Sequence, residues 1–234
     1  MNVVFTRAGV ARGMRRVAPL MFGIAPFAVV VGIVAQGKGL SLAESTLMNL
    51  LVFAGASQLV ALAAWSHPAP VLAATLAAFV VNLRMALMGP ALGQWLDRLR
   101  GVRLWGTLAI MVDHSFALSV ADIRAGGADA GFLLGASLLM WVVWVAASVA
   151  GFLAGAALHL PPGHPLFFAA LAAFIALLVP MWRGSHEAAP WLVAAVVASV
   201  VARALPGTAW YIVAGAAAGS LAGALRDRRR ERSS

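Results

Sequence analysis

Long runs of apolar residues, separated by short polar stretches, make up almost the whole of this chain. Charged residues are absent from five long blocks, apart from one residue in three of them. The blocks are 17–37, 45–96 (with Arg84), 104–121 (with Asp113), 130–182 and 188–225 (with Arg203). Because a membrane-spanning helix needs about 20 apolar residues, they accommodate one, two, one, two and two spans in turn. The pattern predicts about seven to eight hydrophobic helical segments.

Local signals predict how several segments begin, bend and pack. In the first segment, 17–36, Gly23 and Pro26 predict a kink or break, because proline removes a backbone donor and clashes with the preceding turn. Ser41, followed three residues later by Glu44, resembles a capping box that opens the second segment, 45–65. The fourth segment, 104–121, is predicted to be one span with Asp113 at its middle.

Glycines four residues apart predict close helix packing in two later segments. They are Gly151 and Gly155 in the fifth segment, and Gly215, Gly219 and Gly223 in the eighth. A weak internal repeat also relates the two parts of the chain. Gly32 and Gly151 stand 119 positions apart, and so do Arg84 and Arg203. Internal repeats are common in secondary transporters.

Composition agrees with the apolar pattern. Of 234 residues, 62% are hydrophobic and 11% are charged, whereas a soluble domain has about 25% charged residues. We therefore expect an all-α polytopic integral membrane protein with a single transmembrane domain over residues 1–234. Residues 1–16 form a basic N-terminal segment and residues 226–234 a basic tail. The apolar run after the N-terminal arginines exceeds a signal-peptide core, so we expect it to be retained as the first span.

The net charge of +9 does not indicate a nucleic-acid partner. The arginines stand at the ends of hydrophobic segments, where positive charge sets topology and meets anionic lipid. Both basic termini are predicted to lie in the cytoplasm, in a bacterial-type inner membrane. With eight spans, the arginine-containing loop 94–103 would then lie outside. That conflict vanishes if segments 2 and 3 make one effective crossing, in which case the repeat would be inverted.

Few polar residues stand within the spans. They are Asn49, Ser57, Gln58, Asn82, Arg84, Asp113, His114 and Ser115. Polar groups at membrane depth tend to face the bundle interior or a wet cavity. The sequence FAGASQ, residues 53–58, has the composition of an interrupted helix, whose freed N–H groups can hold a carboxylate. The alternative is that Gly55, Ala56 and Ser57 only let two helices pack closely.

Arg84 and Asp113 are the costly residues, because a charge inside a bilayer needs water or a partner. Arg84 either snorkels to the headgroups or pairs with a counter-charge or substrate. Asp113 either carries a proton, which would couple transport to protons, or pairs with Arg84. His114 is adjacent to it but need not share its face of the helix.

Enzymatic functions lack support. Asp113, His114 and Ser115 are consecutive, so on a helix they cannot converge as a catalytic triad. Hydrolase, metalloprotease and P-loop motifs do not occur. Without cysteine, no disulfide, thiolate metal site or redox motif can form. His159 and His164 flank a proline turn and lack carboxylate helpers, so no metal site or cofactor is expected.

Four stretches occur in a recognisable order: PLMFGIAPFAVVVG (19–32), LVFAGASQLVAL (51–62), NLRMALMGP (82–90) and DHSFAL (113–118). They resemble, in the same order, motifs of the AzlC family, the large subunit of two-component branched-chain amino acid exporters. The resemblance implies export of neutral hydrophobic amino acids with a small AzlD-type membrane subunit. Two ionisable positions depart from the family pattern: Met85 replaces a histidine and His114 a glutamate.

These observations predict a membrane transporter rather than an enzyme. We assign substrate binding to Gly55, Ala56, Ser57, Gln58, Asn82 and Arg84, with the FAGASQ backbone and Gln58 on the substrate carboxylate or an amide. We assign ion coupling to Asp113, Arg84 and His114. Transport would be secondary and proton-coupled. The alternatives are the permease subunit of an ATP-driven system and a membrane scaffold that transports nothing.

Overall fold

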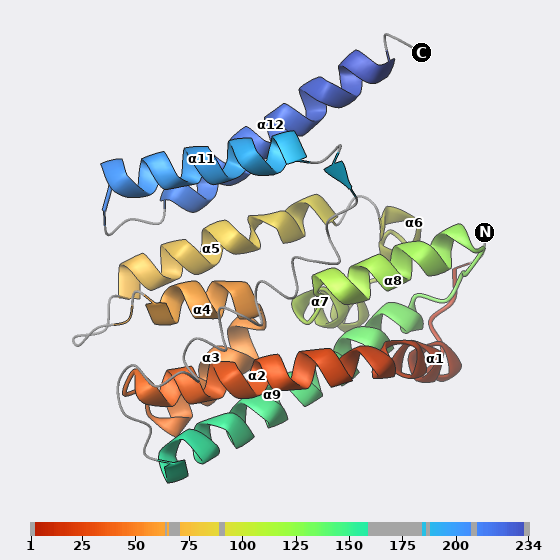
Figure 1. Cartoon of the computed structure of the whole chain (residues 1–234). Coiled ribbons are helices and arrows are strands. Elements are labelled where there is room, and N and C mark those ends of the chain that lie inside the picture. The colour runs from red at the N-terminus through yellow and green to blue at the C-terminus, as the bar shows by residue number, and fades with distance from the viewer. Residues whose placement is uncertain are drawn as a thin grey trace. The chain divides into compact units, whose positions relative to one another are not determined.

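The computed structural model describes residues 3–63, 65, 71–88, 92–158, 184–185, 188–206 and 210–231. These residues form an all-helical fold (Figure 1), as the apolar pattern predicted. In chain order the helices are α1 (Arg7–Val17), the 3-10 helix η1 (Ala18–Leu20), α2 (Met21–Gly37), α3 (Leu42–Val52), α4 (Gly55–Ala63), α5 (Val71–Met88), α6 (Gly93–Leu96), α7 (Gly101–Ala109), α8 (Asp113–Arg124), α9 (Gly131–Leu158), α11 (Ala188–Ala204) and α12 (Trp210–Glu231). The chain divides into two compact units, Met1–Leu59 with Asn82–Ala170 and Val60–Val81 with Leu171–Ser234.

Two long parallel helices form the axis of the first unit. One is the continuous helical stretch Arg7–Gly37 of 31 residues, and the other is α9 with 28; both are long and apolar enough to cross a membrane. Gly13 lies against Phe132 near the start of α9, and Gly32 lies against Ser148 farther along. Moving toward the C-terminus of α2 therefore also moves toward the C-terminus of α9, so the two helices run in the same direction, as Figure 1 shows.

Glycines let the backbones of these two helices touch. A Cβ on Gly32 would overlap the carbonyl oxygen of Ser148, and one on Gly151 would overlap that of Val29. A Cβ on Gly155 would lie 3.3 Å from Ile33 Cα. The close packing predicted for Gly151 and Gly155 is therefore confirmed.

A kink or a break was predicted at Gly23 and Pro26; the break is wrong, and the kink stays a prediction. α2 stays α-helical from Met21 to Gly37 with Pro26 inside it. The departure from α geometry is η1, which has a proline in its first turn. Ile24, Phe27 and other α2 residues on both sides of Pro26 are buried, so tertiary packing holds the helix across the proline. Membrane helices tolerate proline for this reason.

The fourth predicted span is not one helix. α7 ends at Ala109, α8 begins at Asp113, and three non-helical residues separate them. Both outer ends return to the start of α1. The Arg103 guanidinium of α7 lies 5.4 Å from the centre of the Phe5 ring, and Asp122 of α8 pairs with Arg12 at 3.0 Å. We call these two helices the α7–α8 hairpin.

The hairpin helices are too short to span a bilayer. With nine and twelve residues they rise about 13 and 18 Å, against a hydrocarbon core of about 30 Å. The apolar block around them predicted a single span because its hydropathy does not show a backbone break. Asp113 instead opens α8, where a carboxylate is favoured by the N-terminal end of the helix dipole.

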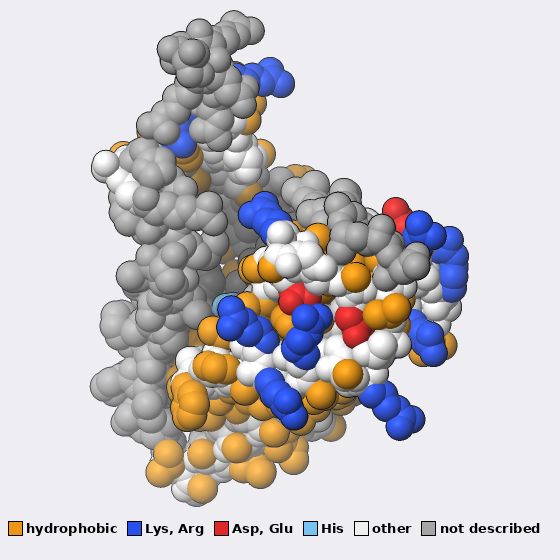
Figure 2. Space-filling view, turned by 90° about the vertical axis from the view of Figure 1, so that its right-hand side faces the viewer, with side chains coloured by type: hydrophobic (Ala, Val, Ile, Leu, Met, Phe, Trp, Pro, Cys, Tyr) orange, Lys and Arg blue, Asp and Glu red, His pale blue; other side chains and the backbone are white. Residues whose placement is uncertain are grey.

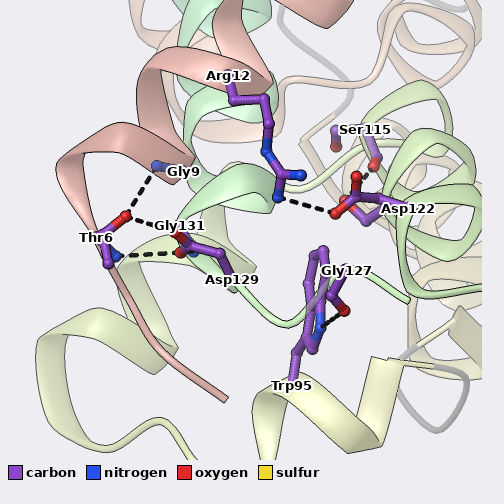
Figure 3. A network of polar contacts seen from close by, with 10 residues as sticks. Thr6, Gly9, Arg12, Trp95, Ser115, Asp122, Gly127, Asp129 and Gly131 are labelled. Atoms are coloured by element: carbon purple, nitrogen blue, oxygen red, sulfur yellow. Dashed lines mark hydrogen bonds and ion pairs between the residues drawn. The ribbon is translucent and has the colours of Figure 1, made fainter. Parts of the chain in front are cut away.

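A polar network joins the starts of α1 and α9 (Figure 3). The Thr6 hydroxyl caps α1 by accepting from Gly9 N–H at 2.9 Å. Asp129 Oδ1 accepts from the backbone N–H of Thr6 at 3.1 Å and of Gly131 at 2.9 Å. One carboxylate therefore serves the N-terminal ends of both long helices.

A hydrophobic cluster packs residues 92–99 against the starts of α1 and α9. Its buried members are Leu92, Trp95, Leu96, Leu99, Met111, Ala130, Phe132 and Leu133. Val3 and Phe5 pack against it, and Trp95 Nε1 donates to the carbonyl of Gly127 at 3.1 Å. Residues 92–104, the N-terminal segment and the α8–α9 loop thus lie together.

We call this part of the first unit the arginine-rich end. Its exposed arginines are Arg7, Arg12, Arg15, Arg16, Arg98, Arg100, Arg103 and Arg124. Three aspartates, Asp97, Asp122 and Asp129, accompany these eight arginines. Figure 2 views the molecule from the side on which the N-terminus lies in Figure 1, and basic side chains gather around a few acidic ones on this face.

This arrangement corrects the predicted topology. Loop 94–103 lies at the same end as residues 3–16, so the expectation that this loop lies on the side opposite the N-terminus is wrong. Gln36, at the other end of α2, lies near Gly155 of α9. Residues 36 and 92 thus lie at opposite ends of the first unit, as they would in the alternative where segments 2 and 3 make one effective crossing; the number of spans stays a prediction. Since the α7–α8 hairpin makes no passage between the ends, α9 runs parallel to α2 and this pair is not inverted. The repeat itself stays a prediction.

In the second unit, α11 and α12 pack as an antiparallel pair. A Cβ on Gly215 would lie 2.9 Å from Ala198 Cβ, and one on Gly219 would lie 2.8 Å from Ala194 Cβ. A Cβ on Gly223 would lie 3.9 Å from Pro190. The predicted glycine face of the last segment is therefore confirmed. Residues 159–183, including His159, His164 and the predicted sixth segment, lie outside the described residues.

Candidate functional site: an interrupted helix in the first unit

The second predicted segment is interrupted where FAGASQ stands. Ser41 and Glu44 form the predicted capping box at the start of α3, with Glu44 N–H donating to Ser41 Oγ at 3.2 Å. α3 ends at Val52, Phe53 takes a left-handed φ of 27°, and α4 begins at Gly55. The interrupted helix that the sequence predicted is confirmed. We call residues 53–58 the helix break.

The helix break brings two opposite helix ends together. The last carbonyls of α3 carry the negative end of its dipole, and the first N–H groups of α4 carry a positive end. The N–H of Gln58 donates to the carbonyl of Ala54 at 2.9 Å, which is the first bond of the new helix. The N–H groups of Gly55, Ala56 and Ser57 precede it, and a helix cannot satisfy the N–H groups of its own first turn.

Aromatic rings from three elements enclose the helix break. The ring centroids of Phe27 in α2 and Trp144 in α9 lie 5.5 Å apart, and those of Phe53 and Trp144 lie 6.2 Å apart; both pairs pack edge to face. A Cβ on Gly55 would lie 2.6 Å from both Phe27 Cε1 and Trp144 Cη2. Glycine is therefore required at position 55 because two rings occupy the space of a side chain.

An amide network crosses from α4 to α3 and α9. Gln58 Nε2 donates to Asn49 Oδ1 at 3.0 Å and to the carbonyl of Met48 at 3.3 Å. Asn49 Oδ1 also accepts from Trp144 Nε1 at 2.8 Å, and Asn49 Nδ2 donates to the carbonyl of Ser45 at 2.7 Å. The donors around Asn49 Oδ1 define the orientation of both amides.

The network is buried. Gln58 is 1% exposed and Asn49 is 0% exposed. Among the described residues, Gln58 Oε1 has no hydrogen-bond partner. A buried acceptor of this kind costs about 1–3 kcal/mol if nothing binds it, so it marks a position where a donor from outside the protein would be stabilising.

Ser57 connects the helix break to α5. Its hydroxyl donates to Asn82 Oδ1 at 3.3 Å. Of the other predicted substrate residues, Ala56 is in α4 and Arg84 in α5, but both side chains lie outside the described residues. The predicted pairing of Arg84 with Asp113 therefore stays a prediction.

The second interruption, inside the α7–α8 hairpin, holds the predicted coupling residues. Asp113 is the first residue of α8 and is partly buried, whereas His114 is exposed. Ser115 Oγ accepts from Val112 N–H at 3.1 Å, and Ser137 of α9 donates to Ser115 Oγ at 2.9 Å. The tip of the hairpin is thus held against α9. Asp113 was expected at the middle of one continuous helix, and this is wrong because α8 begins there; its depth in the membrane stays a prediction.

α9 supplies contacts that the sequence did not predict. Ser137 holds the α7–α8 hairpin, Trp144 holds Asn49, and Trp141 Nε1 donates to the carbonyl of Leu50 at 3.3 Å. These residues stand three, four or seven positions apart, so they share one face of the helix. That spacing was a usable signal, since tryptophan N–H groups in an apolar helix need acceptors.

Comparison with known proteins agrees with this structure. The chain is 32% identical over 171 residues to a membrane protein of Archaeoglobus fulgidus, covering 72% of this chain and 74% of that protein. It is 27% identical over 164 residues to the inner membrane protein YgaZ of Escherichia coli, covering 68% and 65%. A membrane protein of Helicobacter pylori is 25% identical over 198 residues, with 83% and 84% covered. No solved structure matches the chain.

The long apolar helices, the polar helix break and the membrane-protein relatives define a helical membrane protein. A family model described as "AzlC protein" matches residues 19–158. The chain belongs to the AzlC family, and the resemblance seen in its motifs is confirmed.

Proposed function

We propose that this protein is a multi-pass carrier that exports branched-chain or similar neutral hydrophobic amino acids. The observation that supports this most is the helix break, where a buried amide network meets two half-helix ends beside three aromatic rings. Secondary transporters bind substrates at such discontinuous helices. A non-transporting scaffold would gain nothing from buried polar groups that cost stability.

The chemistry of the helix break suits an amino-acid zwitterion. The first-turn N–H groups of α4 are donors for a carboxylate. Asn82 and Arg84, which stand in the next helix, α5, are the other donors we propose for it. The Phe27, Phe53 and Trp144 rings are apolar surfaces for a hydrophobic side chain. Phe53, Ser57 and Gln58 are buried, so binding and release require this part of the protein to open.

Asp113 is the proposed proton-coupling residue, with Arg84 as its counter-charge and His114 beside it. It stands where the α7–α8 hairpin turns back, and the hairpin opens toward the arginine-rich end. Positive charge marks the cytoplasmic side of a membrane protein. We therefore orient the arginine-rich end toward the cytoplasm of a bacterial-type cell, against anionic lipid.

Counterflow in proteoliposomes tests the function. Labelled leucine, valine and methionine would be measured with the protein alone and together with a small AzlD-type subunit. We expect saturable counterflow of at least one of them, strengthened by the small subunit. Equal uptake by empty vesicles and by vesicles with both proteins would refute amino-acid transport.

The energy source is tested on the same vesicles. A proton-coupled carrier loses accumulation when a protonophore is added and is insensitive to vanadate. An ATP-driven permease requires a cytosolic ATPase and is inhibited by vanadate, so that result would favour the alternative.

A further inference from the structure

Gln58 presents an acceptor, not a donor, to any ligand at the helix break. Both of its amide hydrogens face protein acceptors, since Nε2 lies 3.0 Å from Asn49 Oδ1 and 3.3 Å from the carbonyl of Met48. Its Oε1 is buried and has no partner among the described residues. A terminal amide has two donor hydrogens and one acceptor oxygen, so the oxygen is the part that remains for a ligand.

Asn49 and Trp144 prevent the Gln58 amide from reversing. If it reversed, Gln58 Oε1 would face Asn49 Oδ1, and two acceptors would oppose each other. Asn49 cannot reverse either, because its Oδ1 accepts from Trp144 Nε1 at 2.8 Å and its Nδ2 donates to the carbonyl of Ser45. The indole N–H can only donate. The orientation is therefore determined from Trp144 through Asn49 to Gln58.

Asn82 has the opposite polarity. Its Oδ1 accepts from the Ser57 hydroxyl at 3.3 Å, and in this orientation its Nδ2 group remains to donate. The helix break thus combines an acceptor on α4 with donors on α5 and in the first turn of α4. A carboxylate needs donors, whereas an ammonium group has three hydrogens and needs acceptors. Aromatic faces such as that of Trp144 also stabilise a cation.

We propose that Gln58 Oε1 accepts a hydrogen bond from the ammonium group of a zwitterionic substrate, and that Asn49 and Trp144 are positioning residues for it. The carboxylate binds on the opposite side, at Asn82 and the α4 N–H groups. This inference rests on the proposed function, and it reverses the expectation that Gln58 contacts the carboxylate.

Two analogues of leucine each keep only one of its two charged groups. 3-Methylbutylamine keeps the ammonium group and lacks the carboxylate, whereas 4-methylpentanoate keeps the carboxylate and lacks the ammonium group. Inhibition of leucine counterflow by each would be measured for wild type, Gln58→Met and Gln58→Leu. We expect both variants to bind leucine and the amine about tenfold more weakly, as for loss of a hydrogen bond to a charged group, and the acid unchanged.

Asn82→Leu is the matched control, and we expect it to weaken leucine and the acid but not the amine. Asn49→Leu frees the Gln58 amide to reverse, so we expect inhibition by the amine to weaken more than inhibition by the acid. A purely structural role of Asn49 would weaken both analogues by the same factor, and that result would overturn the positioning role. Melting temperatures measured in detergent would check that the variants are folded.

The outcomes separate the two proposals. Leucine counterflow in wild type, with Gln58 variants that lose the acid and keep the amine, would overturn the role of Gln58 and leave the carrier function standing. Absence of amino-acid counterflow in wild type would overturn the proposed function and this inference with it.

Discussion

At the residue scale, the site depends on a few side chains whose size or polarity allows no substitute. Gly55 touches two rings, Asn49 accepts two hydrogen bonds at one oxygen, and Gln58 keeps an acceptor free. FAGASQ was recognised in the sequence because glycine beside polar residues is unusual in an apolar run. Trp144 was not, since its role depends on which helix lies opposite.

Gly55→Val should abolish transport while the protein still inserts. Valine is more apolar than glycine, but its side chain would overlap Phe27 and Trp144, because even a Cβ would lie 2.6 Å from each ring. Overpacking of this kind costs about 1–3 kcal/mol. Leucine counterflow and membrane level would be compared with Gly23→Val, where an added Cβ meets no atom within 4 Å. Full flux in Gly55→Val would exclude the helix break as the substrate site.

Reversing the charges of Arg84 and Asp113 tests whether they are partners. Each single reversal, Arg84→Asp or Asp113→Arg, leaves two like charges at membrane depth and should lower expression strongly. The double reversal should restore the expression level, measured by blotting of membranes. A double variant no better than the singles would exclude the pairing without affecting the transport proposal.

At the element scale, contact between backbones controls the architecture of the first unit. The α2–α9 pair depends on glycine at positions where a Cβ would overlap the neighbouring carbonyl. The α7–α8 hairpin depends on a break that its hydropathy did not show. Apolar patterns predict which segments avoid water, but a span and two half-helices have the same pattern.

Gly32→Ala should destabilise the protein by at least about 2 kcal/mol, because its Cβ would overlap the carbonyl of Ser148. Alanine is otherwise the better helix former by about 1 kcal/mol. Gly23→Ala in the same helix should therefore be neutral or stabilising. Thermal unfolding in detergent would compare the two variants. Equal melting temperatures would contradict the close packing of α2 on α9.

Single cysteines test whether the α7–α8 hairpin enters and leaves on one side. The chain has no cysteine, so it needs no background substitutions. Val102→Cys and Arg124→Cys should react with a membrane-impermeant thiol reagent from the same side as Arg7→Cys. Lys38→Cys, beyond α2, should react from the other side. Opposite labelling of positions 102 and 124 would show that residues 104–121 cross the membrane.

At the scale of the whole molecule, the proposed orientation in the membrane rests on charge and on the direction of the helices. Eight exposed arginines gather at one end of the first unit. The positive-inside rule is the basis on which we propose that this end faces the cytoplasm. Loop 94–103 and Arg124 share this end because the α7–α8 hairpin between them turns back on itself.

The basic tail should lie in the cytoplasm as well. Its arginines are Arg226, Arg228, Arg229, Arg230 and Arg232. A fluorescent protein that matures only in the cytoplasm, fused after Ser234, should be bright, and an alkaline phosphatase fused there should be inactive. The reverse pattern would refute a cytoplasmic C-terminus.

The sequence by itself determined the helical membrane class, the family, the helix break at FAGASQ and the glycine faces of α9 and α12. These features follow from composition and short-range spacing, which act within one segment. Only the tertiary structure decided that α2 continues through Pro26, that Asp113 opens a half-helix, and that α9 runs parallel to α2. It also decided which way the Gln58 amide faces. Each of these depends on a neighbour far away in the chain, such as Trp144 for Asn49, and no local pattern specifies that neighbour.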